Sequence, residues 1–179
     1  EPGVQWTVWG IAEVCCWIGH FPHAMPTGND AAECLEAHLD AGIRHVVWAL
    51  GRSVIEFHTL MPGVTVRGFN THTEPLTVQQ RAVNRMFREK CQLRTALSYA
   101  NEHGMTLCGR LAMNRHYSPG SIHRSRFATL HPQFCEIRKD GWLDPSRLSF
   151  AVPQYREERP NIIMEAVHIG CHGIQLDFC

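Results

Sequence analysis

Residues 92–114, QLRTALSYANEHGMTLCGRLAMN, contain the pattern on which the fold prediction rests. Leu93, Leu97 and Ala100 recur at helical spacing, and an apolar face that includes Met86 extends the predicted amphipathic helix to residues 78–103. Gly104 follows this helix as its expected stop, because glycine often ends helices. The apolar run at 105–113 then predicts a buried strand.

The same order of helix, glycine and apolar strand occurs twice more. The predicted pairs are a helix over residues 30–42 before a strand over 43–50, and a helix ending at Gly170 before a strand over 173–178. In the first helix we expect Asp30 to act as the cap, with Glu33 completing a capping box. In the second, Pro160 would lie within the helix, so either the helix begins close to Pro160 or it kinks there.

Repeated helix, tight turn and buried strand are typical of a parallel α/β fold. Residues 4–10 predict one further strand, whereas residues 11–18 fit a helix and a strand equally well. This makes about four or five strands, while a closed eight-stranded barrel typically needs ~250 residues. The sequence therefore predicts that residues 1–179 are a single incomplete domain, the N-terminal part of a (β/α)8 TIM barrel that continues beyond residue 179. Such a piece should expose a free sheet edge and self-associate.

The connections that leave the predicted strands are long. Residues 51–77 and 114–152 are rich in Gly, Pro, Asn, His and Arg, whereas little more than one glycine joins each helix to the strand that follows. Loops at the carboxyl ends of parallel strands build the active sites of α/β barrels and open parallel sheets. We therefore expect the functional residues at that edge of the sheet.

Composition excludes several classes of function. The 17 basic and 17 acidic residues give a formal net charge of +0, and no long Lys/Arg cluster is present, which argues against a nucleic-acid partner. No apolar run approaches the ~18 residues of a membrane span, so none is expected. No G-x-x-x-x-G-K-[ST], G-x-G-x-x-G, G-x-S-x-G or H-E-x-x-H motif is found, and the eight cysteines include no C-x-x-C pair. We expect neither a cofactor nor a bound metal.

Polar side chains at predicted strand ends are the candidate site residues. In the last strand, alternation places Gln175 and Asp177 on one face, and a carboxylate at the end of a buried strand is costly without a partner. Arg110 and Asn114 share a face of the earlier strand, with His116 just beyond. Arg110, Asn114 and His116 could bind sugar hydroxyls or hold a carboxylate, although Arg110 could equally form a structural ion pair. Asp177 is the strongest candidate, and its alternatives are a cap on a following helix or a structural pair with an arginine.

Aromatic side chains offer a further candidate for substrate binding. Trp142 lies in the loop segment KDGW at 139–142, where a flat indole could serve as a platform for a sugar ring.

Several strings together resemble the glycoside-hydrolase-like TIM-barrel proteins known as family 10-like glycosyl hydrolases. They occur in that family's order over about residues 31–179: YANEHGM (99–105), LAMN (111–114), HPQF (131–134), DG (140–141), LDP (143–145), VPQYR (152–156) and GIQLDF (173–178). The resemblance implies a barrel outside the cytoplasm that acts on glycosidic bonds, with Asp177 and Asn114 lining its cleft. This chain departs from the family pattern at Gln154, Pro160 and His172.

The leading hypothesis is a glycoside hydrolase of poly- or oligosaccharides in which Asp177 is one of two catalytic carboxylates and its partner lies beyond residue 179. Arg110 would hold Asp177 ionised, and Asn114 and His116 would bind substrate hydroxyls. Two alternatives are a catalytically silent carbohydrate-binding barrel and a metal-dependent TIM-barrel hydrolase with His and Asp ligands.

Overall fold

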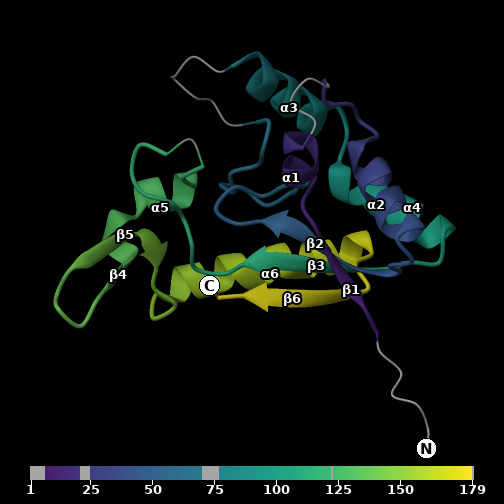
Figure 1. Cartoon of the computed structure of the whole chain (residues 1–179). Coiled ribbons are helices and arrows are strands. Elements are labelled where there is room, and N and C mark those ends of the chain that lie inside the picture. The colour runs from purple at the N-terminus through teal and green to yellow at the C-terminus, as the bar shows by residue number, and fades with distance from the viewer. Residues whose placement is uncertain (1–6, 21–24, 70–76, 122, 179) are drawn as a thin grey trace, which may run out of the picture.

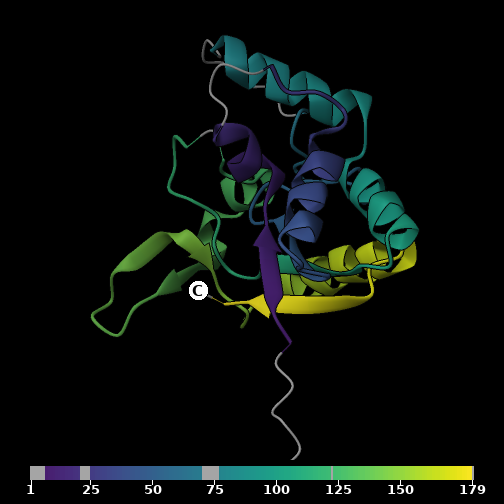
Figure 2. The ribbon, with the colours of Figure 1, turned by 45° about the vertical axis from the view of Figure 1, so that its right-hand side comes forward.

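The computed structural model describes residues 7–20, 25–69, 77–121 and 123–178. Its main sheet has four parallel strands in the spatial order β1-β2-β3-β6, namely β1 (Trp9–Ala12), β2 (His45–Gly51), β3 (Thr106–Ala112) and β6 (Gly173–Asp177). The accompanying helices are α1 (Val14–Gly19), α2 (Asp30–Asp40), α3 (Val78–Glu89), α4 (Gln92–Glu102) and α6 (Pro153–Ile169). Figures 1 and 2 show α1 to α4 gathered on one side of the sheet. The predicted parallel α/β fold is confirmed.

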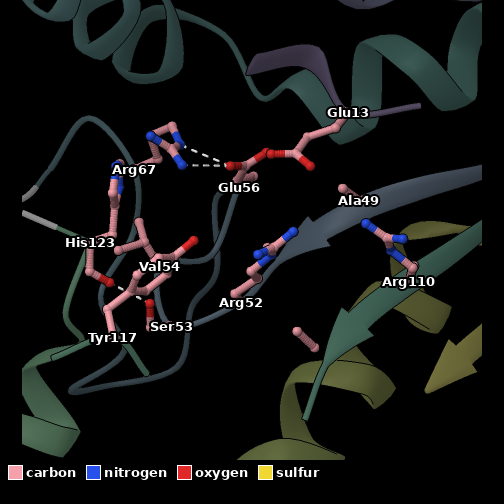
Figure 3. Close-up of a pocket in the computed structure, with 12 residues that line it drawn as sticks. Glu13, Ala49, Arg52, Ser53, Val54, Glu56, Arg67, Arg110, Tyr117 and His123 are labelled. Atoms are coloured by element: carbon pink, nitrogen blue, oxygen red, sulfur yellow. Dashed lines mark hydrogen bonds and ion pairs between the residues drawn. The ribbon is translucent and has the colours of Figure 1, made fainter. Parts of the chain in front are cut away.

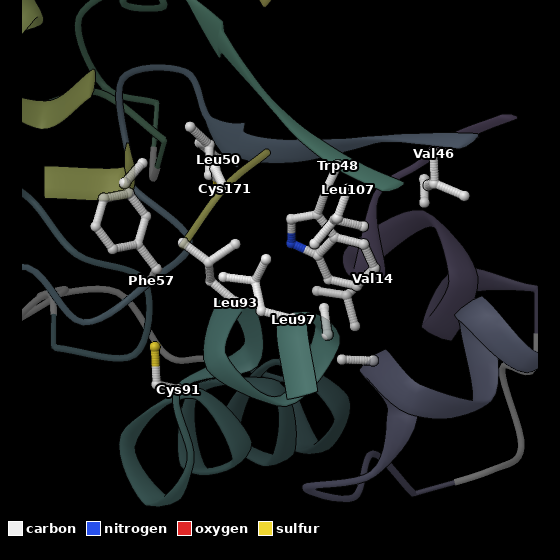
Figure 4. Close-up of a cluster of buried hydrophobic side chains, with 14 of the residues drawn as sticks. Val14, Val46, Trp48, Leu50, Phe57, Cys91, Leu93, Leu97, Leu107 and Cys171 are labelled. Atoms are coloured by element: carbon white, nitrogen blue, oxygen red, sulfur yellow. The ribbon is translucent and has the colours of Figure 1, made fainter. Parts of the chain in front are cut away.

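The main core lies between the sheet and the helices that precede its strands. Figure 4 shows Trp48 of β2 and Leu107 of β3 beside Leu93 and Leu97 of α4, and all four side chains are buried. Because side chains alternate along a strand, the residues next to Leu111 point to the other face of the sheet. Arg110 is one of them, so the helix packing leaves it available on the opposite face.

The predicted helix over residues 78–103 is two helices, α3 and α4, separated at Lys90 and Cys91, whose backbones are extended. The reason is that the two helices cover different parts of the molecule. Arg88 of α3 donates a hydrogen bond to the Gly68 carbonyl at 2.9 Å, whereas α4 packs on the sheet. One straight helix could not make both sets of contacts.

Three other boundaries differ from the predictions. Asn29, not Asp30, is the cap residue of α2, and the Asp30 carboxylate instead accepts from the Thr27 amide at 2.5 Å. Pro160 lies inside α6, where Pro153 takes the first-turn position that suits proline. The predicted strand over residues 4–10 falls partly outside the described residues, and the described strand β1 begins at Trp9.

The long connection after β3 contains structure of its own. It forms α5 (Arg126–Leu130), a 3₁₀ turn (Pro132–Phe134) and an antiparallel hairpin of β4 (Cys135–Ile137) and β5 (Leu143–Leu148). Figure 1 shows this hairpin standing beyond the carboxyl ends of the main strands. The hairpin therefore borders the edge of the sheet at which the sequence predicts the site.

Among the described residues the sheet is open, and no closed barrel is formed. β1 and β6 are its edges, and they carry exposed apolar side chains, including Ile11 (63% exposed) and Leu176 (48% exposed). Barrel closure and self-association remain predictions. None of the described helices is long and apolar enough to cross a membrane.

Candidate functional site

A pocket opens at the carboxyl end of the parallel strands (Figure 3). Glu13 directly follows β1, Glu56 lies in the loop after β2, and Arg110 belongs to β3. The other lining residues come from the ends of β2 and β3 and the loops that follow them: Ala49, Gly51, Arg52, Ser53, Val54, Arg67, Ala112, Tyr117 and His123. The position agrees with the expectation that loops at this edge build the site.

The turn after β2 brings its loop back over the strand end. Gly51 has a φ of +112°, and a Cβ at this position would lie 2.2 Å from the Val54 carbonyl oxygen. Only glycine fits such an approach without strain. The tight return explains how Arg52 and Glu56, which follow the strand in sequence, both reach the pocket.

Glu56 is the most deeply buried carboxylate of the pocket, with 3% of the residue exposed. Its Oε1 accepts from Arg67 Nη2 at 2.7 Å and Nε at 2.9 Å. Its Oε2 is buried and has no well-formed hydrogen bond within the described part of the chain. Burial raises the pKa of Glu56; Arg67 opposes this shift and Glu13 adds to it.

Arg110 connects the pocket to Asp177. Its Nε lies 4.0 Å from Asp177 Oδ2, and 21% of each side chain is exposed. In the register of β3 with β6, Gln175 is opposite Arg110, and Asp177 is opposite Ala112. Three of the sequence-predicted residues, Arg110, Gln175 and Asp177, are thus brought to one end of the sheet.

The other sequence-predicted residues lie elsewhere. Asn114 is buried, and its Nδ2 lies 3.3 Å from Glu136 Oε1 of the hairpin. Trp142 is half exposed near the turn of that hairpin, with the Arg138 guanidinium 4.3 Å from its ring. Neither residue lines the pocket around Glu13 and Glu56.

His116 was predicted to bind substrate hydroxyls, but its ring is fully buried in a network of internal hydrogen bonds. Its Nδ1 lies 2.7 Å from Ser125 Oγ, and its Nε2 lies 2.7 Å from Arg159 Nη2. A guanidinium can only donate, so Nε2 accepts and Nδ1 carries the proton. The role that this geometry supports is to stabilise the loop after β3, and it leaves no ring nitrogen for a sugar.

The buried histidine predicts a specific dependence of stability on pH. Burial, with added repulsion from Arg159 and Arg124, lowers the pKa of His116 well below its ordinary value of 6.5. The unfolded chain takes up a proton near pH 6.5 that the folded protein does not. We therefore expect this residue to lower the free energy of unfolding as pH falls below 6.5, by up to ~1.4 kcal/mol per pH unit.

Urea unfolding at several pH values between 7.5 and 5, a range that spans the ordinary pKa of a histidine, measures how the free energy of unfolding changes with pH. This change per pH unit should become smaller in His116→Gln and stay the same in the control His168→Gln, whose side chain is exposed on α6. Equal slopes in the wild type and His116→Gln would contradict this prediction, because they would mean that His116 binds protons alike in the folded and the unfolded protein.

The pocket also contains groups that the sequence did not single out. Glu13 lies in the segment for which helix and strand were both open, and Glu56 and Arg67 lie in a loop predicted only as functional in general. One signal was available for Glu56: it is the only charged residue in the apolar string VIEF at 54–57. Burying a carboxylate among apolar residues costs free energy unless a partner compensates its charge, so such a residue is a candidate for a functional role.

Comparison with known proteins finds a likeness in fold. No protein family matches the chain, and no curated protein does. Among solved structures, it is similar to the crystal structure of a noncanonic maltogenic alpha-amylase, AmyB from Thermotoga neapolitana, with a TM-score of 0.56 and 12% sequence identity. The similarity covers 97% of this chain but only 39% of the amylase chain. At this identity the likeness shows a glycoside-hydrolase-like fold alone.

Proposed function

We propose that this chain carries part of the active site of an enzyme that hydrolyses glycosidic bonds of an oligo- or polysaccharide, related to the family 10-like glycosyl hydrolases. The observation that carries the proposal is the gathering of acidic groups with arginines at one end of the sheet. Glu13 follows β1, Glu56 lies in the loop after β2 and Asp177 ends β6, while Arg110 lines the pocket and lies beside Asp177. Carboxylates at strand ends, together with the amylase-like fold, support this chemistry more than any other.

In this proposal Asp177 acts as an ionised carboxylate toward the anomeric carbon. The transition state of glycoside hydrolysis has oxocarbenium character, so a negative charge close to that carbon lowers its energy. The Arg110 guanidinium lies 4.0 Å from Asp177 Oδ2 and supplies a positive charge beside this carboxylate. Gln175 lies opposite Arg110 on the neighbouring strand, and its exposed side-chain amide can hydrogen-bond to sugar hydroxyls.

Glycoside hydrolysis also needs a second carboxyl group that supplies a proton to the leaving oxygen. The sequence placed this partner beyond residue 179. Glu13 and Glu56 are candidates within the described chain, because both lie in the pocket that Arg110 lines.

The proposal is tested by incubating the protein with a panel of oligo- and polysaccharides and measuring released reducing ends. We expect turnover on at least one glycan, with no loss after treatment with a chelator. Tight binding of a glycan without hydrolysis would favour a carbohydrate-binding barrel, and activity that a chelator removes would favour a metal-dependent hydrolase. Either result would contradict the proposal.

A further inference from the structure

Two carboxyl groups face each other at the upper rim of the pocket. Figure 3 shows the Glu13 side chain pointing toward the Glu56 carboxyl, on the side of Glu56 away from Arg67. Oε1 of Glu56 takes both contacts from Arg67, whereas the buried Oε2 has no hydrogen bond of regular geometry from the described residues, and the Cys15 thiol is a further hydrogen-bonding neighbour of Glu56. A thiol is a weak donor, so a buried carboxyl oxygen beside a second carboxylate still requires a physical explanation.

The surrounding charges do not remove this conflict when both carboxyls are ionised. Arg67 balances one negative charge, and the guanidinium groups of Arg52 and Arg110 line other parts of the pocket. The thiol of Cys15, which is also next to Glu56, stays neutral because burial, with Glu56 as a further cause, raises its pKa. Like charges at close range in a buried place repel strongly, and one of the two groups then keeps its proton.

A single proton on the pair explains both the buried Oε2 atom of Glu56 and the close approach of the two carboxyl groups. A protonated Glu56 can donate through Oε2, and the Glu13 carboxylate that faces it is the available acceptor. The repulsion between two anions becomes a charge-assisted hydrogen bond. The raised pKa of Glu56 agrees with this arrangement.

We propose that Glu13 and Glu56 share one proton at neutral pH, and that Glu13 passes it to the departing sugar oxygen in the reaction proposed above. Both residues line the pocket, but Glu13 is the member that can reach a substrate, because it is only partly buried whereas Glu56 is 3% exposed. Glu13 is therefore the catalytic residue of the pair, and Glu56 is a positioning residue that keeps the proton available. This inference rests on the proposed function for its chemistry, but the shared proton itself does not.

The proton and electron balance is that of ordinary glycoside hydrolysis. The bond between the anomeric carbon and the glycosidic oxygen breaks, its electron pair goes to that oxygen, and the Glu13 carboxyl gives the oxygen a proton. An oxygen from water ends on the anomeric carbon, either directly or after a covalent step on Asp177. After a covalent step, Glu13 takes a proton from the attacking water. In a direct displacement Asp177 takes that proton and releases it to solvent, from which the carboxyl pair is protonated again, so water is the only other reactant.

The arrangement of the strands is consistent with Glu13 as the proton donor and Asp177 as the ionised carboxylate. β1 and β6 lie at opposite edges of the sheet with β2 and β3 between them, so three strand spacings put their backbones ~14 Å apart along the sheet. Glu13 follows β1 and Asp177 ends β6, and Arg110 belongs to β3, which lies between these two strands. A proton donor and an ionised carboxylate on opposite sides of the scissile bond are what the reaction requires.

The first experiment detects the proton without any substrate. Infrared spectroscopy at neutral pH should show the carbonyl stretch of a buried protonated carboxyl in the wild type. The band should disappear in Glu56→Gln, change position in Glu13→Gln because its acceptor has changed, and stay as it is in the control Glu36→Gln, an exposed residue of α2. Absence of the band would overturn the shared proton. So would stabilisation of the wild type by added Ca²⁺ or Mg²⁺ that Glu13→Gln abolishes, because it would show a cation between the carboxyls.

The second experiment tests delivery of the proton. Glu13→Gln should lower kcat/KM about 10²–10⁴-fold for a glycan, whose leaving alcohol needs a proton, and far less for an aryl glycoside with an acidic phenol as leaving group. Glu56→Gln should move the alkaline limb of the pH–rate profile to lower pH, a shift that a purely structural residue would not cause. Glu36→Gln should leave both rates and the profile unchanged.

The two experiments separate the inference from the function on which it rests. Equal losses on both substrates in folded Glu13→Gln would overturn the role of Glu13 as acid while hydrolysis itself stands. An infrared band in a protein that hydrolyses no glycan would overturn the proposed function and proton delivery together, but would confirm the shared proton.

Discussion

Replacing Asp177 by asparagine should lower kcat for glycoside hydrolysis by orders of magnitude, about 10²–10⁴-fold, while the protein stays folded. The amide keeps the size of the side chain but removes the negative charge that would stabilise the oxocarbenium-like transition state. Steady-state kinetics on the glycan that the wild type hydrolyses, together with a thermal melt of the same sample, provide the measurement.

The melt decides between a catalytic and a structural role of Asp177. The Arg110–Asp177 distance of 4.0 Å and the 21% exposure of each side chain describe a partly hydrated pair, so losing it should cost about 1 kcal/mol or less. A structural ion pair in a dry interior would instead cost ~3–5 kcal/mol, because a guanidinium would be left buried without its partner. Asp40→Asn, at the exposed end of α2, is the matched control and should change neither kcat nor the melting temperature. A large loss of stability with unaltered turnover of the folded fraction would rule out Asp177 as a catalytic residue.

Replacing Arg159 by methionine should lower the free energy of unfolding by about 3–5 kcal/mol, as expected when one member of a buried charged network is removed. Arg159 is 1% exposed, although it lies on a helix. It donates to the Arg52 carbonyl at 2.9 Å, to Tyr155 Oη at 3.1 Å and to His116 Nε2 at 2.7 Å. Without the guanidinium these acceptors stay buried and lose their donor.

Chemical denaturation measures this loss, and Arg156→Met is its control, because Arg156 lies on the same helix with an exposed side chain. We expect the control to stay within about 0.5 kcal/mol of the wild type. Arg159→Lys should recover only part of the loss, since an ammonium cannot match the spread of three donors that a planar guanidinium directs. A wild-type-like Arg159→Met would mean that the network contributes no net stability.

The prediction from sequence was most successful for the regular elements. The apolar runs before residue 50, around residue 110 and after residue 173 are all strands of one parallel sheet. Periodicity identifies such segments because the side chains that a strand or helix buries recur at a fixed spacing. Periodicity did not reveal the break between α3 and α4, because both helices have apolar faces at helical spacing. The break is needed only because the two helices pack against different parts of the molecule and so run in different directions.

The site was predicted less completely. Strand alternation placed Arg110, Gln175 and Asp177 at the carboxyl end of the sheet, where the structure has them, since their positions follow from the strands themselves; their roles remain predictions. His116 follows the same strand, yet the chain turns inward there, and Tyr155 and Arg159 of a distant helix surround it. No local pattern distinguishes a histidine that ends in a pocket from one that ends in the interior.

The sequence by itself determined the parallel α/β class and the edge of the sheet at which polar groups collect, because both follow from the order and spacing of apolar residues along the chain. Only the tertiary structure decided that Glu13 and Glu56 face each other, that Arg67 contacts Glu56, and that His116 is enclosed. These residues come from separate connections whose paths depend on close packing, such as the return of the chain at Gly51. The chemistry of a carboxyl group depends on the charges and the water around it, and those neighbours are set by contacts between segments far apart in the sequence.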